Sequence, residues 1–468
     1  MEQLTGLDAA FLAVETPTAH MQVMGIVVLD PATIPGDGTH SYYERVRALL
    51  EARLHLVPPL RRRIVEVPFG IQVPSWIEDP DFDLDYHVRR AALPAPGGPR
   101  ELAAFCADVA SRPLDRDKPL WESYVVEGLE HGYQAFVTKL HHSMIDGVAG
   151  VSILAALFDL EPTTPAEPLQ PPEEWMPERV PGEAEMLGRA VVSIVQHPPN
   201  VVRATMNFVP GVVRAIRRAR TQDLKVALPL TAPRLSLNRT ITAHRVISLS
   251  SVSLADLKAV KNALGVTVND VVLAVIAGAL RSYLLRRDEL PDKPLVAAIP
   301  TSVRTADDDQ FGNRVSSMFA ALPVEVADPI ERVRAVAESM SGAKGVHEEV
   351  GPSTLQDWAA TATPAMFNRA MRAYTRLRIG QRLRPIINVI VSNVPGPPWP
   401  LYLAGAQMVA IHPMGPIFDD CGLNATVISY LDHVDFGFLA CRELVPDVDH
   451  LAGFVPDALT ELMKAAAV

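Results

Sequence analysis

The stretch KLHHSMIDGVAG, residues 139–150, places two adjacent histidines four and five residues before an aspartate that is followed by glycine. The apolar residues that lead into it predict a β-strand over residues 134–142. Because successive side chains of a strand point to opposite faces, His142 is expected on one face and His141, with Lys139, on the other. Only one of the two imidazoles can therefore serve a given site.

His142, at the end of an apolar strand, has the chemistry of a general base. An imidazole with an ordinary pKa of about 6.5 is largely neutral at cellular pH and can take a proton from a hydroxyl group. The alternative is that both histidines are ordinary hydrogen-bonded residues of the core. Asp146 either orients the histidine segment through an ion pair or caps the helix predicted from Gly147. Gly147 is expected to allow a backbone conformation or a close approach that a Cβ would prevent.

The sequence does not predict a metal site. Such a site needs three or more converging ligands, and two adjacent histidines on opposite faces of a strand supply only one. Cys106, Cys421 and Cys441 lie far apart and form no CxxC pair. We expect them to be reduced core residues, neither thiolate ligands nor disulfide partners.

Length and composition predict a globular protein with two domains. The 468 residues exceed one ordinary hydrophobic core, and 48% hydrophobic with 21% charged residues argues against disorder as the main state. The net charge of -11 disfavours nucleic acid as a partner, because phosphate binding depends on a basic surface. No apolar run approaches the roughly 20 residues that span a bilayer. Glu2 and Asp8 stand where a signal peptide would be positively charged, so we expect a cytoplasmic protein.

A proline-rich segment divides the chain. Residues 161–181 contain seven prolines and several acidic residues, a composition typical of an extended linker. We predict a first α/β domain over residues 1–160, a linker with a helical crossover over residues 161–242, and a second α/β domain over residues 243–468.

Apolar periodicity predicts strands and helices in both domains. The spacings of Thr5 with Asp8 and of Thr267 with Asp270 resemble capping boxes and predict two helix starts. A last helical stretch, residues 447–465, is expected to be broken in two by Pro456. Further strands are predicted within residues 20–30, 121–142 (a hairpin), 244–250, 295–300, 385–394 and 422–440, and further helices over residues 42–54, 102–110, 147–157, 254–264 and 329–341.

Several common catalytic signatures are missing from the sequence. There is no GxSxG elbow, no GxxxxGKS/T loop, no GxGxxG after a strand and no HExxH. This disfavours a lipase, a nucleotide-hydrolysing enzyme, a dinucleotide oxidoreductase and a zinc protease.

The chain resembles the bacterial wax ester synthase/diacylglycerol acyltransferases, whose hallmark HHxxxDG stands here at residues 141–147. Other matching segments follow in the expected order through nearly the whole chain. They are LTGLDAAFLAVE (4–15), WIEDPDFDLDYHVRR (76–90), PLDRDKPLWE (113–122), VNDVVLA (268–274), PTSVR (300–304), GNRVS (312–316), SNVPGP (392–397), GLN (422–424) and SY (429–430).

The resemblance implies the fold of chloramphenicol acetyltransferase and the CoA-dependent acyltransferases. That fold has two similar α/β domains with mixed sheets, joined by a crossover, and an active-site channel between them. The implied activity is an O-acyltransferase that uses acyl-CoA as co-substrate, without a cofactor, to make triacylglycerol from diacylglycerol or wax esters from long-chain alcohols. The second histidine of the motif, His142, is the implied general base. No acyl-enzyme is required, and His141 is expected to support or pack.

The resemblance also implies substrate-binding residues: Asn269 with Asp270, Ser392 with Asn393, and Pro119 with Leu120 and Trp121. Asn269 is the candidate donor to the tetrahedral oxyanion, but it also suits the first turn of a helix. The segment 119–121 has a structural alternative, a rigid turn before a core strand. The segment 392–397 likewise reads as a strand end with a Pro-Gly turn.

Lipid acceptors imply contact with a membrane or a lipid droplet. Segment 201–220 combines apolar residues with Arg214, Arg217 and Arg218. It is expected either to lie on an anionic surface, such as the inner membrane or a lipid droplet, or to pack between domains with a solvated arginine face. Two alternatives to the acyltransferase of storage lipids stay open. One is a lipid-binding or lipid-body protein of the same fold with little turnover, and the other is an acyltransferase for a specialised complex lipid.

Overall fold

The computed structural model describes residues 1–35, 41–144, 147–162, 177, 179–182, 184–188, 192, 231–303, 313, 315–350 and 384–468. Its strands are β1 (Glu2–Gln3), β2 (Gln22–Asp30), β3 (Arg62–Val65), β4 (Ser75–Glu78), β5 (Val88–Ala92), β6 (Trp121–Glu127), β7 (Gln134–His141), β8 (Arg245–Ser253), β9 (Leu295–Ser302), β10 (Val315–Leu322), β11 (Val389–Val394), β12 (Tyr402–Leu403), β13 (Ala406–Met414), β14 (Leu423–Tyr430) and β15 (His433–Cys441). Its α-helices are α1 (Gly6–Val14), α2 (Tyr42–Arg53), α3 (Leu84–His87), α4 (Pro99–Ala110), α5 (Gly147–Leu157), α8 (Leu254–Leu264), α9 (Val268–Arg286), α10 (Pro329–Val350) and α14 (Val448–Ala466).

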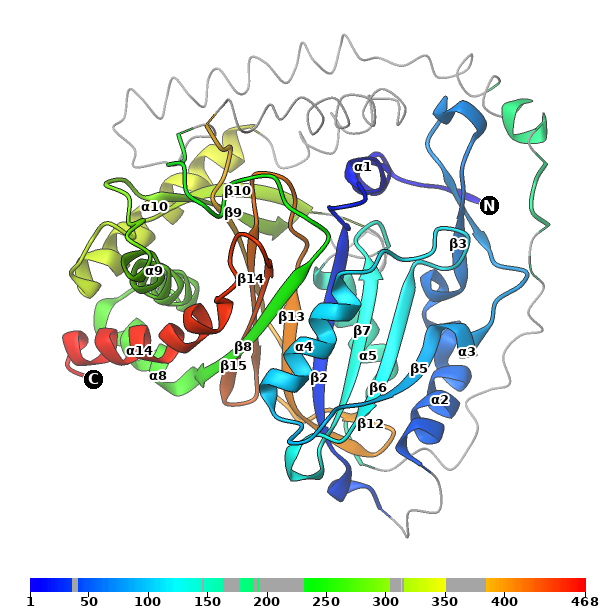
Figure 1. Cartoon of the computed structure of the whole chain (residues 1–468), viewed down its shortest axis with the longest axis horizontal. Coiled ribbons are helices and arrows are strands. Elements are labelled where there is room, and N and C mark those ends of the chain that lie inside the picture. The colour runs from blue at the N-terminus through cyan, green and yellow to red at the C-terminus, as the bar shows by residue number, and fades with distance from the viewer. Residues whose placement is uncertain are drawn as a thin grey trace.

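Two six-stranded sheets lie side by side in the centre of the molecule (Figure 1). The first has the order β12-β13-β2-β7-β6-β5 and the second the order β10-β9-β11-β14-β15-β8. Both are mixed, because β5 runs parallel to β6, and β11 runs parallel to β9 and β14, among antiparallel neighbours. The predicted α/β fold with two mixed sheets is confirmed.

The order of strands crosses the predicted domain boundary. β13 comes late in the chain, yet it pairs with β2 from Gln407 opposite Asp30 to Met414 opposite Met24. β12 extends the same sheet beyond β13. The division at residue 243 therefore separates elements along the chain, but it does not separate the two sheets.

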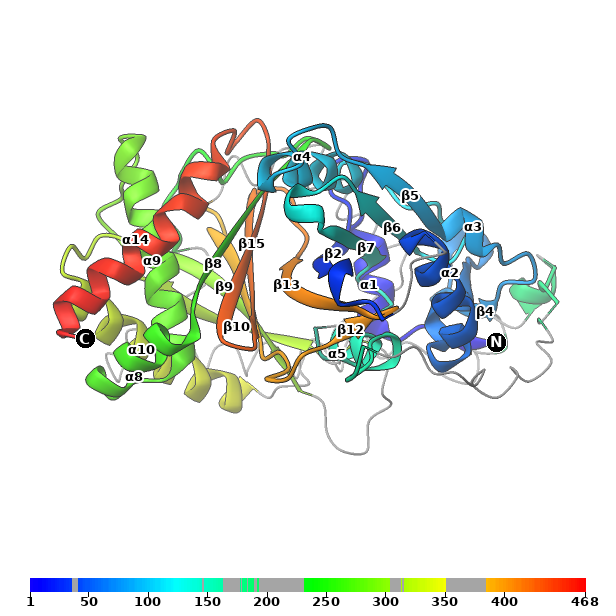
Figure 2. The same ribbon diagram turned by 90° about the horizontal axis from the view of Figure 1, so that it is seen from below.

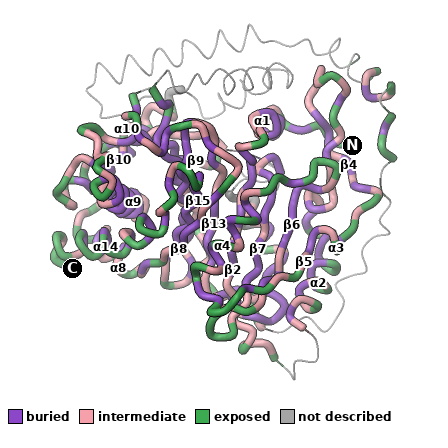
Figure 3. The backbone as a smooth tube through the Cα atoms, viewed as in Figure 1, coloured by how far each residue is buried: buried purple, intermediate pink, exposed green. Residues whose placement is uncertain are grey.

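Helices cover the sheets on different sides. α8, α9, α10 and α14 lie together on the outer side of the second sheet (Figure 2). On the first sheet, buried residues of α2 and α5 belong to one apolar cluster and those of α4 to another. Along β7 the side chains alternate between these clusters, with Phe136 in the first and Val137 in the second. The central strands of both sheets are buried along most of their length (Figure 3).

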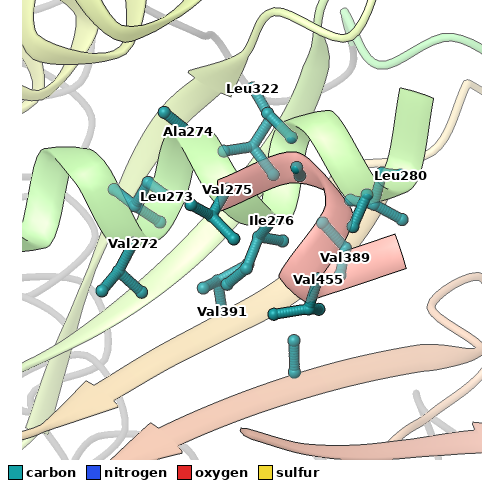
Figure 4. Packing of buried hydrophobic residues seen from close by; sticks show 14 of the residues in the cluster. Val272, Leu273, Ala274, Val275, Ile276, Leu280, Leu322, Val389, Val391 and Val455 are labelled. Carbon is teal, nitrogen blue, oxygen red and sulfur yellow. The ribbon is translucent and has the colours of Figure 1, made fainter. Parts of the chain in front are cut away.

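Helix α9 forms the centre of the second core. Every residue from Asp270 to Leu280 is buried. Figure 4 shows residues of this helix packed with Val389 and Val391 of β11 and Val455 of α14. α9 is the one described helix that is long and apolar enough to cross a membrane, and 72% of its most apolar window is buried inside the protein. A helix that is apolar all round is what a core of this size requires.

The prediction that Pro456 divides the last helix is wrong. α14 continues from Val448 to Ala466 with Pro456 inside it. Leu451, Val455 and Leu459 are buried on the side that packs against α9. An internal proline costs about 3 kcal/mol, whereas each large apolar side chain contributes about 1.5–3 kcal/mol on burial. The continuous apolar stripe therefore outweighs the proline.

Local signals were stronger guides to helix starts. Thr267 and Asp270 form the predicted capping box, with each residue's side chain bonded to the other's backbone N–H. Thr5 caps α1 by accepting from the backbone N–H of Asp8. The carboxylate of Asp8 accepts from the hydroxyl of Thr5 through Oδ2, while its Oδ1 faces Asn313, as described below. The three cysteines are free and buried, as predicted, and burial raises the pKa of Cys421 to about 12.

Candidate active site

The two histidines of the HHxxxDG motif stand where β7 ends. His141 is the last residue of the strand, and its backbone N–H donates to the carbonyl of Leu120, beside β6, at 2.9 Å. The N–H of His142 donates in the other direction, to the carbonyl of Met21 beside β2, at 2.7 Å. The neighbouring strands thus hold the backbone of both residues, while their side chains enter different surroundings.

The imidazole of His142 is half-buried between α1 and Asn313. Its Nδ1 lies 3.2 Å from Oδ1 of Asn313. On one face the ring of Phe11, in α1, stacks at 4.1 Å between centroids with 14° between planes. The site is therefore built from both halves of the chain.

The amide of Asn313 has a defined orientation. Its Nδ2 donates to Oδ1 of Asp8 and to the backbone carbonyl of His142, each at 2.6 Å. Both partners are acceptors here, so the NH₂ group must face them and Oδ1 must face the imidazole. Nδ1 of His142 then carries the proton of that hydrogen bond, which leaves the lone pair of the neutral ring on Nε2.

His141 has the opposite arrangement. Its Nδ1 lies 3.1 Å from the backbone nitrogen of Ser143, which can only donate, and 2.7 Å from the hydroxyl of the same serine. Nδ1 is therefore the acceptor, and Nε2 carries the proton. Nε2 lies 3.7 Å from a carboxylate oxygen of Glu15, which Arg116 holds at 2.6 Å. Burial lowers the pKa of His141 well below its usual value, so the residue is neutral and its lone pair serves the turn.

Asp8 completes the polar cluster. Its Oδ2 accepts from the hydroxyl of Thr5 at 2.6 Å, while Oδ1 accepts from Asn313. The residue is 4% exposed, and burial raises the pKa of Asp8 even though the hydrogen bonds from Thr5 and Asn313 act in the other direction. Of the remaining motif residues, Asp146 lies outside the described residues, and Gly147 begins α5 as predicted.

The candidates at the start of α9 and the end of β11 meet each other. Nδ2 of Asn393 donates to Oδ1 of Asn269 at 3.1 Å. Because the amide oxygen of Asn269 faces Asn393, the NH₂ group of Asn269 points away from Asn393 as a hydrogen-bond donor. The carboxylate of Asp270 accepts from the N–H and the hydroxyl of Thr267 at 2.9 and 2.7 Å, and it therefore has a capping role. Ser392 is half-buried on β11.

The turn after β11 also has a structural requirement. A Cβ on Gly396, in the SNVPGP segment, would collide with the backbone carbonyl of Ser429. The N–H of Gly396 lies 3.2 Å from the hydroxyl of the same serine. Close packing of this turn on the end of β14 accounts for the glycine without a substrate.

The segment Pro119-Leu120-Trp121 lies in the first core. Leu120 is 1% and Trp121 2% exposed. The indole N–H of Trp121 donates to the carbonyl of Leu60 at 2.7 Å, and its ring stacks on His87 at 4.5 Å between centroids. These contacts support the structural interpretation of the segment, and its part in substrate binding stays a prediction.

The structure places at the site three residues for which the sequence predicts no role there: Phe11, Asn313 and Asp8. Asn313 and Phe11 lie in the segments GNRVS and LTGLDAAFLAVE, which carried the resemblance without an assigned function. Asp8 was predicted only as part of a helix cap. Their presence in matching segments was the one available signal.

A cavity of about 370 Å³ lies between loops of the first sheet and β8, lined among others by Pro99, Tyr133, Ser251 and His412. His142 is not part of its lining, so the predicted channel to His142 stays a prediction.

Among the residues that the structure describes, no group of three or more His, Cys, Asp or Glu side chains could hold a metal ion.

Comparison with known proteins covers nearly the whole chain. The family model "Wax ester synthase/diacylglycerol acyltransferase catalytic domain" matches residues 4–272, and the "WS/DGAT C-terminal domain" matches residues 311–463. A Mycobacterium tuberculosis protein with the provisional name diacylglycerol O-acyltransferase is 37% identical over 470 residues, which cover 100% of this chain and 91% of that protein.

Solved structures agree. The wax ester synthase/diacylglycerol acyltransferase from Marinobacter aquaeolei VT8 matches with a TM-score of 0.71 and 29% identity, and the match covers 100% of both chains. The starter condensation domain of rhizomide synthetase, solved with C8-CoA and Leu-SNAC, matches with a TM-score of 0.57 and 13% identity over 100% of this chain and 94% of that one. At that identity the second match shows the shared fold alone.

Proposed function

Because the chain belongs to the wax ester synthase/diacylglycerol acyltransferase family and is thus an acyl-CoA-dependent O-acyltransferase, we propose that His142 is the general base of the transfer.

The observation that carries the proposal is the opposite surroundings of the two Nδ1 atoms, which face a donor in His141 and an amide oxygen in His142. Nδ1 of His141 accepts from the N–H of Ser143, so its lone pair is used inside the fold. Nδ1 of His142 donates to Asn313, so its lone pair lies on Nε2, the nitrogen at the far end of the ring from that contact. A general base needs a lone pair that a substrate hydroxyl can reach.

The proposed reaction is a direct acyl transfer. The hydroxyl oxygen of the acceptor attacks the thioester carbonyl carbon while its proton moves to Nε2 of His142. The tetrahedral intermediate collapses with cleavage of the C–S bond, and the imidazolium returns the proton to the departing thiolate. The products are an ester and free CoA, and no acyl-enzyme forms.

We assign the stabilisation of the oxyanion to Asn269. Its NH₂ group is the donor left after Oδ1 accepts from Asn393. It also lies in the first turn of α9, where the helix dipole is positive. A donor directed at the developing negative charge contributes about 3–4 kcal/mol to such reactions.

The proposed donor is a long-chain acyl-CoA, and the proposed acceptors are diacylglycerol and long-chain alcohols. These acceptors lie in membranes or lipid droplets. We therefore also propose that the protein acts at such a surface, with segment 201–220, outside the described residues, as the contact. Replacing Arg214, Arg217 and Arg218 with alanine should weaken binding to anionic liposomes, and unchanged binding would rule out this contact.

The central experiment follows labelled acyl-CoA in the presence of diacylglycerol and hexadecanol, with free CoA and labelled ester measured together. The wild type should release CoA and form ester in equal amounts, and His142→Ala should lose at least about 100-fold in kcat. His450→Ala, a change at an exposed surface histidine, is the matched control.

Two outcomes would contradict the proposal. Bound lipid without release of CoA from any acceptor would favour a lipid-binding protein. A His142→Ala enzyme with wild-type turnover would remove the general base from the mechanism.

A further inference from the structure

We propose that Asp8 and Asn313 are positioning residues that determine which nitrogen of His142 holds the proton. This inference rests on the proposed role of His142 as general base. Both residues act on the Nδ1 side of the ring, whereas the proposed reaction takes place at Nε2. They are therefore positioning residues that do not accept the proton of the alcohol.

The contacts form a directional chain from α1 to the imidazole. The hydroxyl of Thr5 donates to Oδ2 of Asp8 at 2.6 Å. Oδ1 of Asp8 accepts from Nδ2 of Asn313 at 2.6 Å. Oδ1 of Asn313 then accepts from Nδ1 of His142 at 3.2 Å. Each link fixes whether the next group donates or accepts.

An asparagine side chain can by itself present either its oxygen or its NH₂ group to a neighbour. Here a turned amide would put Oδ1 of Asn313 against the Asp8 carboxylate and the His142 carbonyl, and both hydrogen bonds would be lost. Its NH₂ group would then face Nδ1 and require the lone pair there. Nε2 would carry the proton and could not accept one from an alcohol.

The negative charge of Asp8 is what allows only one orientation of the Asn313 amide. An ionised carboxylate only accepts, whereas a protonated one could donate to the turned amide oxygen. Asp8 is buried, which disfavours its charge and raises its pKa, and the donors Thr5 and Asn313 reduce that cost. On the other side of the motif, the charges of Arg116 and Glu15 pair with each other beside His141.

The position of Asn313 adds a consequence for the whole enzyme. It stands two residues before the start of β10 in the second sheet, while Asp8 and His142 belong to elements around the first. The proton arrangement of the base therefore depends on correct contact between the two halves of the molecule.

The test exchanges the two side chains. Asn313→Asp alone puts two carboxylates side by side and should lower kcat by about 100-fold, with KM changed little. The double variant Asp8→Asn/Asn313→Asp restores a donor opposite an acceptor, and it should recover at least about tenfold in kcat over the single variant. In the double variant a carboxylate faces Nδ1–H of His142. The acidic limb of its kcat profile should move up by about one pH unit, because a nearby anion favours the imidazolium.

Asn388→Asp is the matched control. Asn388 is also a fully buried asparagine, and its side chain bonds Asn238 and the backbone of Pro233 and Val296. This change should lower the melting temperature without moving the acidic limb. A double variant no more active than Asn313→Asp, or an acidic limb that moves equally in Asn388→Asp, would overturn the positioning role.

A second measurement does not depend on activity. Nitrogen NMR of wild-type protein labelled at histidine should show a neutral His142 protonated at Nδ1 and a neutral His141 protonated at Nε2, assigned by loss of each signal in His142→Ala and His141→Ala. A His142 protonated at Nε2 would disprove the inference even in an active enzyme. If His142→Ala proves active while NMR shows the expected arrangement, the proposed function fails and the contact chain stands.

Discussion

The ring of Phe11 lies nearly parallel to the imidazole of His142, with 4.1 Å between centroids and 14° between planes. Helix α1 thereby covers one face of the ring while Asn313 holds its Nδ1 edge. A contact on the face of the ring and a contact at its edge together restrict both the tilt and the rotation of the imidazole. A base that must meet a hydroxyl at hydrogen-bond distance gains from such restriction.

Phe11→Leu should therefore lower kcat by about 2- to 10-fold and leave KM nearly unchanged. Stacked aromatic pairs contribute about 0.5–1.5 kcal/mol beyond the area they bury, and leucine keeps most of the apolar volume. Steady-state kinetics with acyl-CoA and one acceptor would measure the effect. Phe105→Leu, which alters an edge-to-face contact with Tyr124, is the control. Equal kcat in Phe11→Leu and wild type would show that the stack does not position the base.

His141→Ala should mainly lose stability. The change removes the acceptor for the Ser143 N–H and leaves a cavity at a residue that is 1% exposed. We expect the free energy of unfolding to fall by about 2–4 kcal/mol, measured by chemical denaturation. Turnover per folded molecule should stay within about tenfold of wild type. A variant as inactive as His142→Ala, with its stability intact, would reverse the roles of the two histidines.

The buried His20 predicts how stability depends on pH. Burial lowers the pKa of His20 to about 4, and the nearby Arg245 acts in the same direction. The unfolded chain, with an ordinary pKa near 6.5, takes up the proton first as pH falls. The contribution to stability is therefore complete above about pH 6.5. It decreases toward pH 4 by about 1.4 kcal/mol per pH unit for one such group.

His20→Leu should make the free energy of unfolding depend less on pH. Between about pH 6.5 and 4 its slope should fall by about 1.4 kcal/mol per pH unit, as measured by urea unfolding at several pH values. The lowered pKa of His141 contributes a slope of the same sign, so the variant keeps part of the dependence. Parallel stability curves for the variant and the wild type would contradict the assignment to His20.

Trp121→Phe separates the two interpretations of the segment Pro119-Leu120-Trp121. The variant leaves the Leu60 carbonyl without the indole donor and fills less of the core, so the free energy of unfolding should fall by about 2–4 kcal/mol. If the segment is structural, kcat and KM at low temperature should match the wild type. Trp399→Phe, at a residue that is 53% exposed, is the control and should change neither property. A raised KM at unchanged stability would favour a direct role in substrate binding.

Elements specified by their own residues were predictable from the sequence. The helices at Gly147–Leu157 and Leu254–Leu264 have the predicted bounds, and β6 and β7 form the hairpin predicted over residues 121–142. The capping box of Thr267 with Asp270 is likewise local, since its two partners are three residues apart. Periodicity and caps act over such distances.

Long-range partners were not predictable in the same way. β13, which contains Pro413, has little strand signal of its own and forms because β2 offers an open edge. The alternation of side chains along a strand also could not predict the surroundings of His142. β7 ends at His141, and the direction of the next side chain is set by the turn that follows. Asn313 reaches His142 across 171 positions of the chain, and no spacing rule connects them. The resemblance pointed to these segments without indicating their contact.

The insertion of β12 and β13 means that neither half of the chain is an autonomous folding unit. A fragment that ended in the linker would expose the edge of β2, with unpaired N–H and C=O groups that invite pairing with other chains. Fragments made separately would have to find one another before the sheet that carries the catalytic motif could close. A chimera that joins the first half of one relative to the second half of another would likewise place a foreign strand two positions from β7, in the sheet that ends at the two histidines.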